Sequence, residues 1–237
     1  NGRAPGEPLF PEMWPLEALL AKKAKVLDFT WAALYQGRPR PKGGKVFHEP
    51  RFYSALPTEG YRGAFGVDLA YTAKTSADWS ICLEMWRQHR EGAEPLFFVV
   101  HVDRAQVEAP DFALTLKGRH VRRKHWKMLW RASGTEKGSA TFIQRPGIPL
   151  QAKAPPGDKL VSATDVAAVW NDGRLLVPDP ERFPGCEEWL YPFLDVVANF
   201  TGSGKERDAD VDALGNAYEA LRSVEVGGTV RIKSSRY

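Results

Sequence analysis

The chain has 237 residues, of which 43% are hydrophobic, enough for one substantial core with a small appendage. Its formal net charge is +4, and its only two cysteines, Cys82 and Cys186, are in no C-x-x-C pair, which argues against a disulfide framework and a structural zinc site. Apolar runs are far shorter than a membrane span and the N-terminus lacks a signal-peptide pattern, so we expect a protein without membrane association in a reducing, cytoplasmic compartment.

The first fifty residues differ in composition from the rest. Residues 16–34 have the pattern of one or two helices, and residues 36–45 (QGRPRPKGGK) have the composition of a linker. We therefore predict a linker and helical segment at 1–58 and a regular domain at 59–237.

Alternating and helical patterns follow from Tyr61 onwards. Three strands are expected at about 61–70, 79–87 and 95–103, and their short connections predict an antiparallel meander. The later elements, in chain order, are a helix at 111–124, a strand at 126–132, a helix at 137–144, a strand at 148–151, a helix at 162–170, a strand at 174–177 and helices at 185–198 and 208–222. Strands followed by alternating β and α units predict an α/β fold, a mixed sheet flanked by helices.

Asp68 is expected midway along the first of these strands. It shares its face with Gly66 and Ala70, whose small side chains leave room for an ion or a phosphate. A buried carboxylate must be paired or bind a metal, and magnesium or manganese prefers oxygen ligands. The alternative is an aspartate that caps a turn at the end of the strand.

A second acidic group opens the last helix. At about 100° per residue, Asp208 and Asp212 lie only about 40° apart on that helix, whereas Asp210 points away from them. Asp208 and Asp212 can therefore act together. The alternative for Asp208 is N-terminal capping, because the helix dipole favours an anion in the first turn.

A basic run without any acid occupies residues 117–131. Such a run can hold DNA phosphates without reading sequence, and Arg122, Arg123 and Lys127 are its candidate contacts. The alternative is the solvated face of a helix.

Several stretches resemble the large terminases of tailed bacteriophages and prophages. Large terminases join a motor half to a nuclease half. The stretches that resemble the segment between these halves are residues 6–17 (GEPLFPEMWPLE), 33–39 (ALYQGRP) and 43–47 (GGKVF). Those resembling the C-terminal nuclease domain, a member of the RNase H-like superfamily, are Asp158-Lys159, residues 167–178 (AAVWNDGRLLVP) and 208–214 (DADVDAL). The resemblance is patchy but keeps the family's order along nearly the whole chain.

The resemblance implies a metal site with ligands at Asp68, at Asp208 or Asp212, and at an acid after the fourth strand. Here the fourth strand ends in residues 129–134 (LWRASG), which contain no carboxylate, and the nearest is Glu136. Glu136 is therefore the candidate middle ligand, with a helix acid stabilised by the dipole as the alternative. Lys159 is a candidate phosphate contact, although an ordinary surface lysine is the default interpretation.

The implied function is a divalent-metal-dependent endonuclease that cuts concatemeric double-stranded viral DNA during genome packaging. It would use two Mg²⁺ or Mn²⁺ ions. The implied partners are double-stranded DNA and, in the full-length protein, an ATPase domain, the small terminase subunit and the portal, in the host cytoplasm. Residues 201–206 (TGSGKE) lack the Ser or Thr of a Walker loop, so no ATPase activity is expected from this chain alone. The alternatives are another RNase H-like nuclease of the junction-resolvase type, and a catalytically weak module that grips DNA or docks on the portal.

Overall fold

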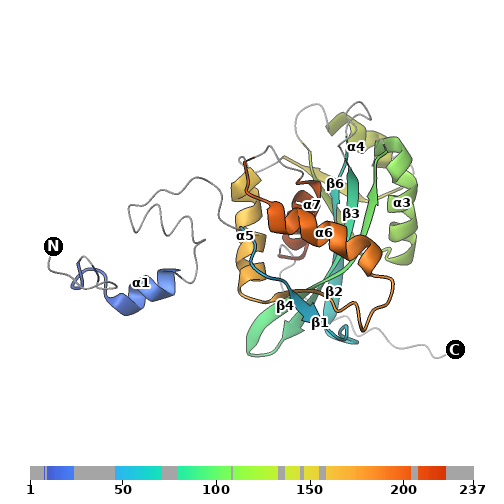
Figure 1. Ribbon diagram of the computed structural model, residues 1–237. Helices are drawn as coiled ribbons and strands as arrows, with labels where there is room; N and C mark the ends of the chain where they lie inside the picture. Colours follow the sequence, from blue (N-terminus) through green and yellow to red (C-terminus); the bar gives the residue numbers. More distant parts are fainter. Residues whose placement is uncertain are drawn as a thin grey trace.

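The computed structural model describes residues 8, 10–23, 46–70, 79–107, 109–132, 137–144, 147–154, 159–203 and 208–222, and for 137–139, 142, 159 and 162 the backbone alone. Figure 1 shows the arrangement of the elements. In chain order they are α1 (Leu16–Lys23), β1 (Arg51–Tyr53), β2 (Tyr61–Asp68), β3 (Ser80–Arg90), β4 (Ala93–Ala105), α3 (Ala109–Arg122), β5 (Lys127–Arg131), α4 (Lys137–Gln144), β6 (Leu150–Lys153), α5 (Lys159–Asn171), β7 (Leu175–Pro178), α6 (Glu187–Asn199) and α7 (Ala209–Arg222).

The strands form one mixed sheet in the order β1-β7-β4-β3-β2-β5-β6. The first three long strands, β2, β3 and β4, pair antiparallel, as their short connections predicted. The remaining pairs, β2 with β5, β5 with β6, β4 with β7 and β1 with β7, are parallel. The sheet thus combines an antiparallel meander with parallel strands, as expected for the fold class.

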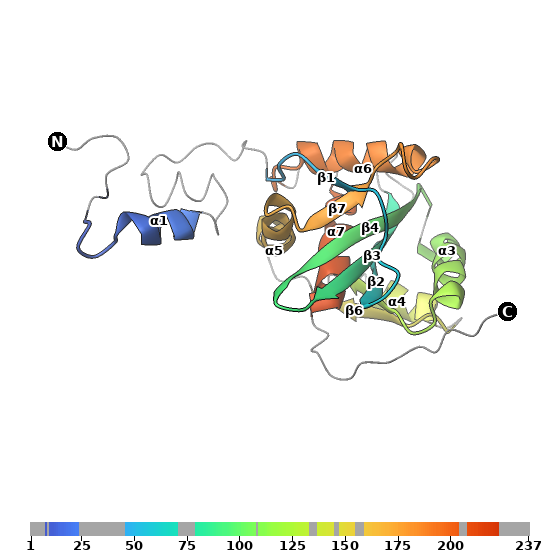
Figure 2. The same ribbon diagram turned by 90° about the horizontal axis from the view of Figure 1, so that it is seen from below.

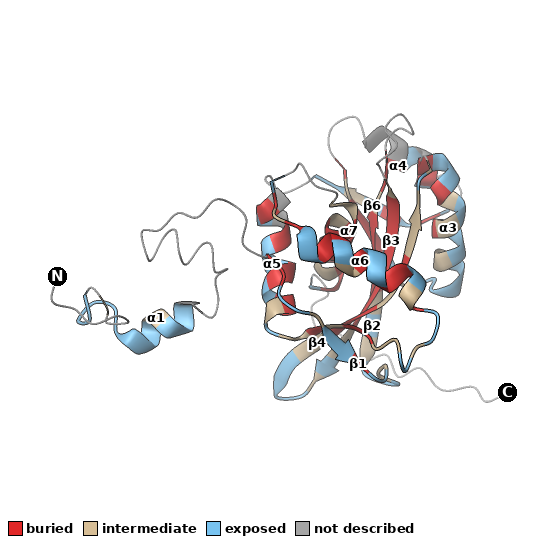
Figure 3. Ribbon diagram, in the orientation of Figure 1, coloured by how far each residue is buried: buried red, intermediate tan, exposed pale blue. Residues whose placement is uncertain are grey.

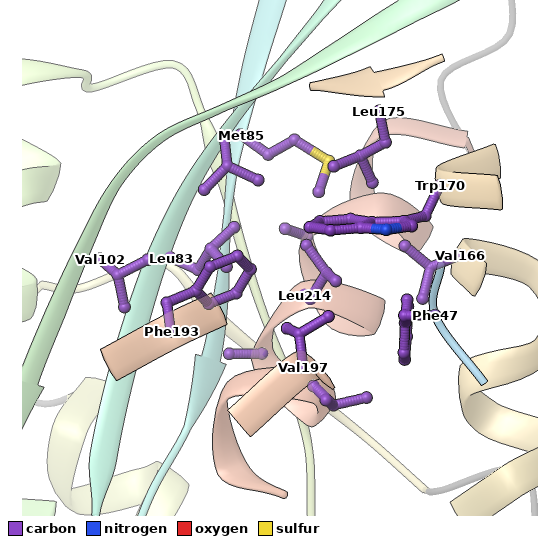
Figure 4. Close-up of a cluster of buried hydrophobic side chains, with 14 of the residues drawn as sticks. Phe47, Leu83, Met85, Val102, Val166, Trp170, Leu175, Phe193, Val197 and Leu214 are labelled. Carbon is purple, nitrogen blue, oxygen red and sulfur yellow. The ribbon is translucent and has the colours of Figure 1, made fainter. Parts of the chain in front are cut away.

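Each face of the sheet has its own core. The larger core packs β3 and β4 against α5, α6 and α7, and includes Leu83, Trp170 and Phe193. Figure 4 shows these side chains gathered between strands and helices. The smaller core lies under α3 and α4, around Phe65 and Phe112. Figure 2 shows α3 and α5 on opposite sides of the strands, and Figure 3 shows that the buried residues of the helices face the sheet.

The segment before residue 59 contributes to this body. Val46 and Phe47 are buried in the larger core, and the Phe47 ring contacts Trp170 and Phe200 edge-on. The short strand β1 also joins the sheet beside β7. The packed body therefore begins upstream of the predicted division at residue 59, because buried aromatic residues tie residues 46–53 to the helices.

Candidate nuclease site

Asp68 is the last residue of β2, not a residue in the middle of the strand. The sequence pattern suggested a strand to residue 70, but the pairing with β3 ends at Asp68 opposite Ile81. Ala70 then donates its backbone N–H to the Ser80 hydroxyl, 3.1 Å away. The carboxylate therefore stands at the carboxyl end of a central strand and is partly exposed.

Helix α7 lies directly on β2 beside this position. A Cβ atom added to Gly66 would lie 1.9 Å from the Ala213 carbonyl oxygen and 2.4 Å from the Ala217 nitrogen. Only glycine allows two backbones to approach this closely. The space over Gly66 is therefore filled by the backbone of α7, and not left for an ion or a phosphate as the sequence suggested.

One side of α7 is fixed close to Asp68. The Asn216 side-chain amide donates a buried hydrogen bond of 2.8 Å to the backbone oxygen of Val67, the residue before Asp68. Asp212 lies one turn before Asn216, and Asp208 one turn before Asp212, with a hydrogen bond of 2.9 Å from the Asp212 N–H to the Asp208 carbonyl. Because residues four apart share a side of a helix, Asp208 and Asp212 lie on the side of α7 that carries Asn216.

Asp210 has a different environment. Its side chain is buried, and one carboxylate oxygen lies 3.3 Å from an Arg104 guanidinium nitrogen. The Arg104 guanidinium also lies over the ring of Trp79, 5.0 Å from its centre. Asp210 thus takes part in an ion pair away from the side occupied by Asp208 and Asp212, consistent with the helical angles.

Two basic residues share a row of the sheet with Asp68: Arg131 on the neighbouring strand β5, which belongs to the basic run, and Arg104 two strands away on β4, which no sequence pattern marked. Asp68 is opposite Ile81, and Ile81 is opposite Arg104. On the other side Val67 pairs with Trp130, so the next residues along the two strands, Asp68 and Arg131, are neighbours. In the sequence, each of these arginines lies at or next to the end of a predicted strand. Which strand ends lie near Asp68 depends on the order of the strands in the sheet.

The donor chemistry of these acids fits a hard divalent cation. Asp68, Asp208 and Asp212 supply only carboxylate oxygens, the ligands that Mg²⁺ and Mn²⁺ prefer. In the described residues, no three His, Cys, Asp or Glu side chains are placed so that they could share one metal ion. The candidate middle ligand, Glu136, lies outside the described residues. Its role stays a prediction.

The part of the basic run from Arg122 to Lys127 lies toward the other end of the sheet, whereas Arg131 lies beside Asp68. Arg123 lies over the rings of Trp126 and Trp86, 4.9 and 5.7 Å from their centres, and Trp86 pairs with Gly63. Gly63 is five residues before Asp68, a distance of about 17 Å along a strand. Arg122 and Lys127 are exposed at this same end. Their contact with DNA stays a prediction, as does that of Lys159, whose side chain is not described.

Acids from the sheet balance part of the basic run. Arg119 donates two hydrogen bonds, of 2.6 and 2.7 Å, to the two carboxylate oxygens of Asp103, and lies 3.8 Å from Glu84. Burial raises the pKa of the Asp103 carboxyl, but hydrogen bonds from His101 and Arg119 outweigh it, so the pKa lies below its usual value. The absence of acids in the sequence run therefore does not mean that its charges are unpaired in the fold.

Searches with the sequence found no match among protein families and none among curated proteins. Solved structures match the fold. For the large terminase of one thermophilic bacteriophage, solved in crystal form 3, the TM-score is 0.57 at 12% sequence identity, and the match covers 88% of this chain and 54% of that one. For the large terminase nuclease from the thermophilic phage G20c with bound zinc, the TM-score is 0.49 at 16% identity, over 73% of this chain and 94% of that one.

The strand order defines the class. An antiparallel meander, β4-β3-β2, followed on the other side of β2 by parallel β5 and β6, is an RNase H-like sheet. The fold is shared with the first of these large terminases, about half of whose length the chain spans. The fold that the sequence resemblance implied is confirmed. Among the described residues, no helix has the length and apolar character needed to cross a membrane.

Proposed function

We propose that the chain is the nuclease part of a phage or prophage large terminase, a divalent-metal-dependent endonuclease that cuts concatemeric double-stranded DNA during genome packaging. The observation that carries this proposal is the hydrogen bond from Asn216 to Val67, which fixes α7, the helix that bears Asp208 and Asp212, on the strand that ends at Asp68. The terminase-like motifs and the fold shared with a large terminase support the same function.

Asp68, Asp208 and Asp212 would hold Mg²⁺ or Mn²⁺, with Glu136 as the proposed further ligand. When bound, two such ions supply Lewis acidity to the scissile phosphate and lower the pKa of a bound water. The contribution of the chain is placement. Gly66 allows α7 to lie on β2, and Asn216 sets the position of Asp212 relative to Asp68. Clustered carboxylates repel one another, which favours cation binding.

The remaining parts of the proposal concern partners. We propose that double-stranded DNA is the substrate and that, in the full-length protein, an ATPase domain, the small terminase subunit and the portal complete the packaging machinery in the host cytoplasm. The large terminase that shares the fold has also been solved in complex with ADP, which fits a nucleotide-binding part in the longer protein.

A plasmid-nicking assay tests the function. Supercoiled DNA incubated with the protein and Mn²⁺ should be nicked and then linearised, and a chelator should stop the reaction. Asp68→Asn should abolish cleavage without changing the thermal unfolding midpoint appreciably, because the amide has the same shape but is a poor ligand for hard cations. Preference for a four-way junction over plain duplex would identify a resolvase instead. DNA binding without any Mn²⁺-dependent cleavage by the wild-type chain would identify a DNA-gripping module.

A further inference from the structure

Three charged side chains form a hydrogen-bonded triad on the α7 face of the sheet, close to Asp68. Arg131, the last residue of β5, donates hydrogen bonds of 3.0 and 2.6 Å from Nε and Nη2 to one carboxylate oxygen of Glu219 on α7. Lys153, the last residue of β6, donates a hydrogen bond of 2.8 Å to the other oxygen. We call these residues the Glu219 triad.

The strand register places the triad next to the candidate metal ligand. Arg131 is paired with Lys153, and it follows Trp130, the partner of Val67. Asp68, Arg131 and Lys153 therefore form a row across three parallel strands, with about 4.8 Å between neighbouring strands. All three point to the α7 side, since Glu219 contacts both basic residues and the intervening Trp130 lies in the core on the other face.

The charges of the triad do not cancel. Two cations share one carboxylate, which leaves one net positive charge beside the acids. Lys153 is about half exposed, at 48%, whereas Arg131 and Glu219 are 18% and 20% exposed, so the ammonium group can be reached from solvent. Nη1 of Arg131 has no hydrogen-bond partner among the described residues, and this nitrogen adds a second donor.

Glu219 is suited to hold these cations in place. Burial raises the pKa of its carboxyl, but hydrogen bonds from Lys153 and Arg131 outweigh burial and the pKa lies below its usual value. The carboxylate therefore stays ionised at neutral pH. It uses one oxygen for each basic residue, which fixes the spacing of the two cations along the row.

We propose that Arg131 and Lys153 bind a backbone phosphate of the DNA strand that is cut at Asp68, and that Glu219 is the residue that positions them. The proposal deepens the nuclease function and rests on it. A strand running across the carboxyl ends of β2, β5 and β6 would present successive phosphates to the acids and to the triad. An anion beside a metal-binding acid cluster needs such a neighbouring positive charge, because unliganded carboxylates repel the phosphate backbone.

Lys153 allows a test that leaves the core unchanged. The affinity for a short duplex would be measured at several salt concentrations in the presence of chelator, so that no cleavage occurs. Lys153→Gln should reduce the slope of log affinity against log salt by about 0.9, the value for one lost phosphate contact, and Lys153→Arg should restore it. The matched control is Arg182→Gln, which removes one exposed positive charge from the turn after β7 and should leave the slope unchanged.

Cleavage kinetics test the positioning residue. Glu219→Gln removes the negative charge but keeps both cations, so the salt slope should not fall, whereas kcat for plasmid cleavage should fall because the phosphate is misplaced. A wild-type slope and KM in Lys153→Gln, with normal cleavage by the wild-type chain, would show that the triad only ties α7 to the sheet. That result overturns the inference and leaves the proposed nuclease function intact. A wild-type chain that neither binds nor cleaves DNA would overturn both.

Discussion

Neighbouring acids on α7 differ in what they contact, and the difference assigns them different roles. Asp212 lies on the side of the helix that carries Asn216, whose side chain bonds Val67, the residue before Asp68. Asp210, two residues earlier, is buried in an ion pair with Arg104, whose side chain is itself only 11% exposed. The first position suits a metal ligand, and the second suits a residue that fixes the helix on the sheet.

Substitutions at these two positions should separate catalysis from stability. Asp212→Asn should slow metal-dependent cleavage by at least about 100-fold, because mutation of even an outer-shell partner of a metal site lowers metal affinity or activity about 10- to 100-fold. The substitution should change the unfolding free energy little. Asp210→Asn should cost about 3 kcal/mol of stability, the scale for breaking a buried ion pair, while the folded fraction cleaves normally. The checks are initial rates on plasmid DNA and urea unfolding. Equal loss of activity in both variants would contradict this division.

Glu136 is the residue whose role depends most on the proposed metal site. If it is the middle ligand, Glu136→Gln should raise the Mn²⁺ concentration needed for half-maximal cleavage and also slow the reaction at saturating Mn²⁺. If Glu136 only stabilises the start of a helix, Glu136→Gln should instead cost under about 1 kcal/mol of stability and leave cleavage nearly unchanged. A metal titration of cleavage rates separates these outcomes, with Asp68→Asn as the inactive reference.

At the scale of elements, the seating of α7 on β2 sets the geometry of the candidate site. Gly66 permits the approach, Asn216 fixes the helix along the strand, and the Glu219 triad ties its later turns to β5 and β6. Three independent contacts thus hold one helix in register with the strand that carries Asp68. A shift of this helix would move Asp208 and Asp212 relative to Asp68.

A single added methyl group tests this seating. Gly66→Ala would place a Cβ within 2.4 Å of two α7 backbone atoms, so the helix must move, and we expect a loss of about 3 kcal/mol, the upper end for overpacked cores. Gly118→Ala in α3 adds the same group where nothing lies within 4 Å, and it should stabilise by roughly 0.5–1 kcal/mol through helix propensity. Urea unfolding measures both. Comparable stability of the two variants would show that α7 does not pack directly against Gly66.

The end of α3 and the start of β5 carry the other predicted DNA contacts. Arg122→Gln combined with Lys127→Gln should lower the salt slope of duplex binding by up to about 1.8, or 0.9 per lost phosphate contact, without loss of stability, because both side chains are exposed. Arg123→Gln is expected to lower stability as well, since Arg123 packs on Trp86 and Trp126. An unchanged salt slope of duplex binding in the double variant would show that these two residues of the basic run are only a solvated surface.

For the whole molecule, hydrophobic clusters of different size cover both faces of one sheet, and charged networks connect the sheet to the helices on each face. Asp103 with Arg119 joins β4 to α3, and Glu219 with Arg131 joins α7 to β5. Both carboxyls have pKa values below their usual range. The response of the fold to acid should therefore depend on these two networks.

Acid should weaken the fold through these carboxyls. A carboxyl whose pKa is lower in the folded state contributes stability above its unfolded pKa of about 4, and that contribution is lost as the pH falls through the folded pKa. Asp103→Asn should reduce stability at pH 7 and make the loss below pH 4 less steep. Thermal unfolding from pH 7 to pH 3 measures this, with Asp172→Asn, an exposed carboxylate, as the control. If Asp103→Asn loses stability below pH 4 as steeply as the wild-type chain, Asp103 is not the source of the acid sensitivity.

The sequence by itself determined most of the elements, because their patterns are local. The meander, the helix at 137–144 and the last helix were predicted to within a few residues. It missed β1, a strand of three residues that is too short to show alternation and is held only by pairing with β7. It also placed Asp68 in mid-strand, since Leu69 and Ala70 continue the alternation although the ladder with β3 ends at Asp68.

The relations between distant residues were decided only by the tertiary structure. Periodicity showed that Asp208 and Asp212 share a side of a helix. The position of that helix against the strand that carries Asp68 depends on Gly66, which leaves space for the helix, and on the bond from Asn216 to Val67. The Glu219 triad joins residues 66 and 88 positions apart and has no sequence pattern. Local patterns record which face of an element is buried, whereas strand order and helix placement determine which charges become neighbours.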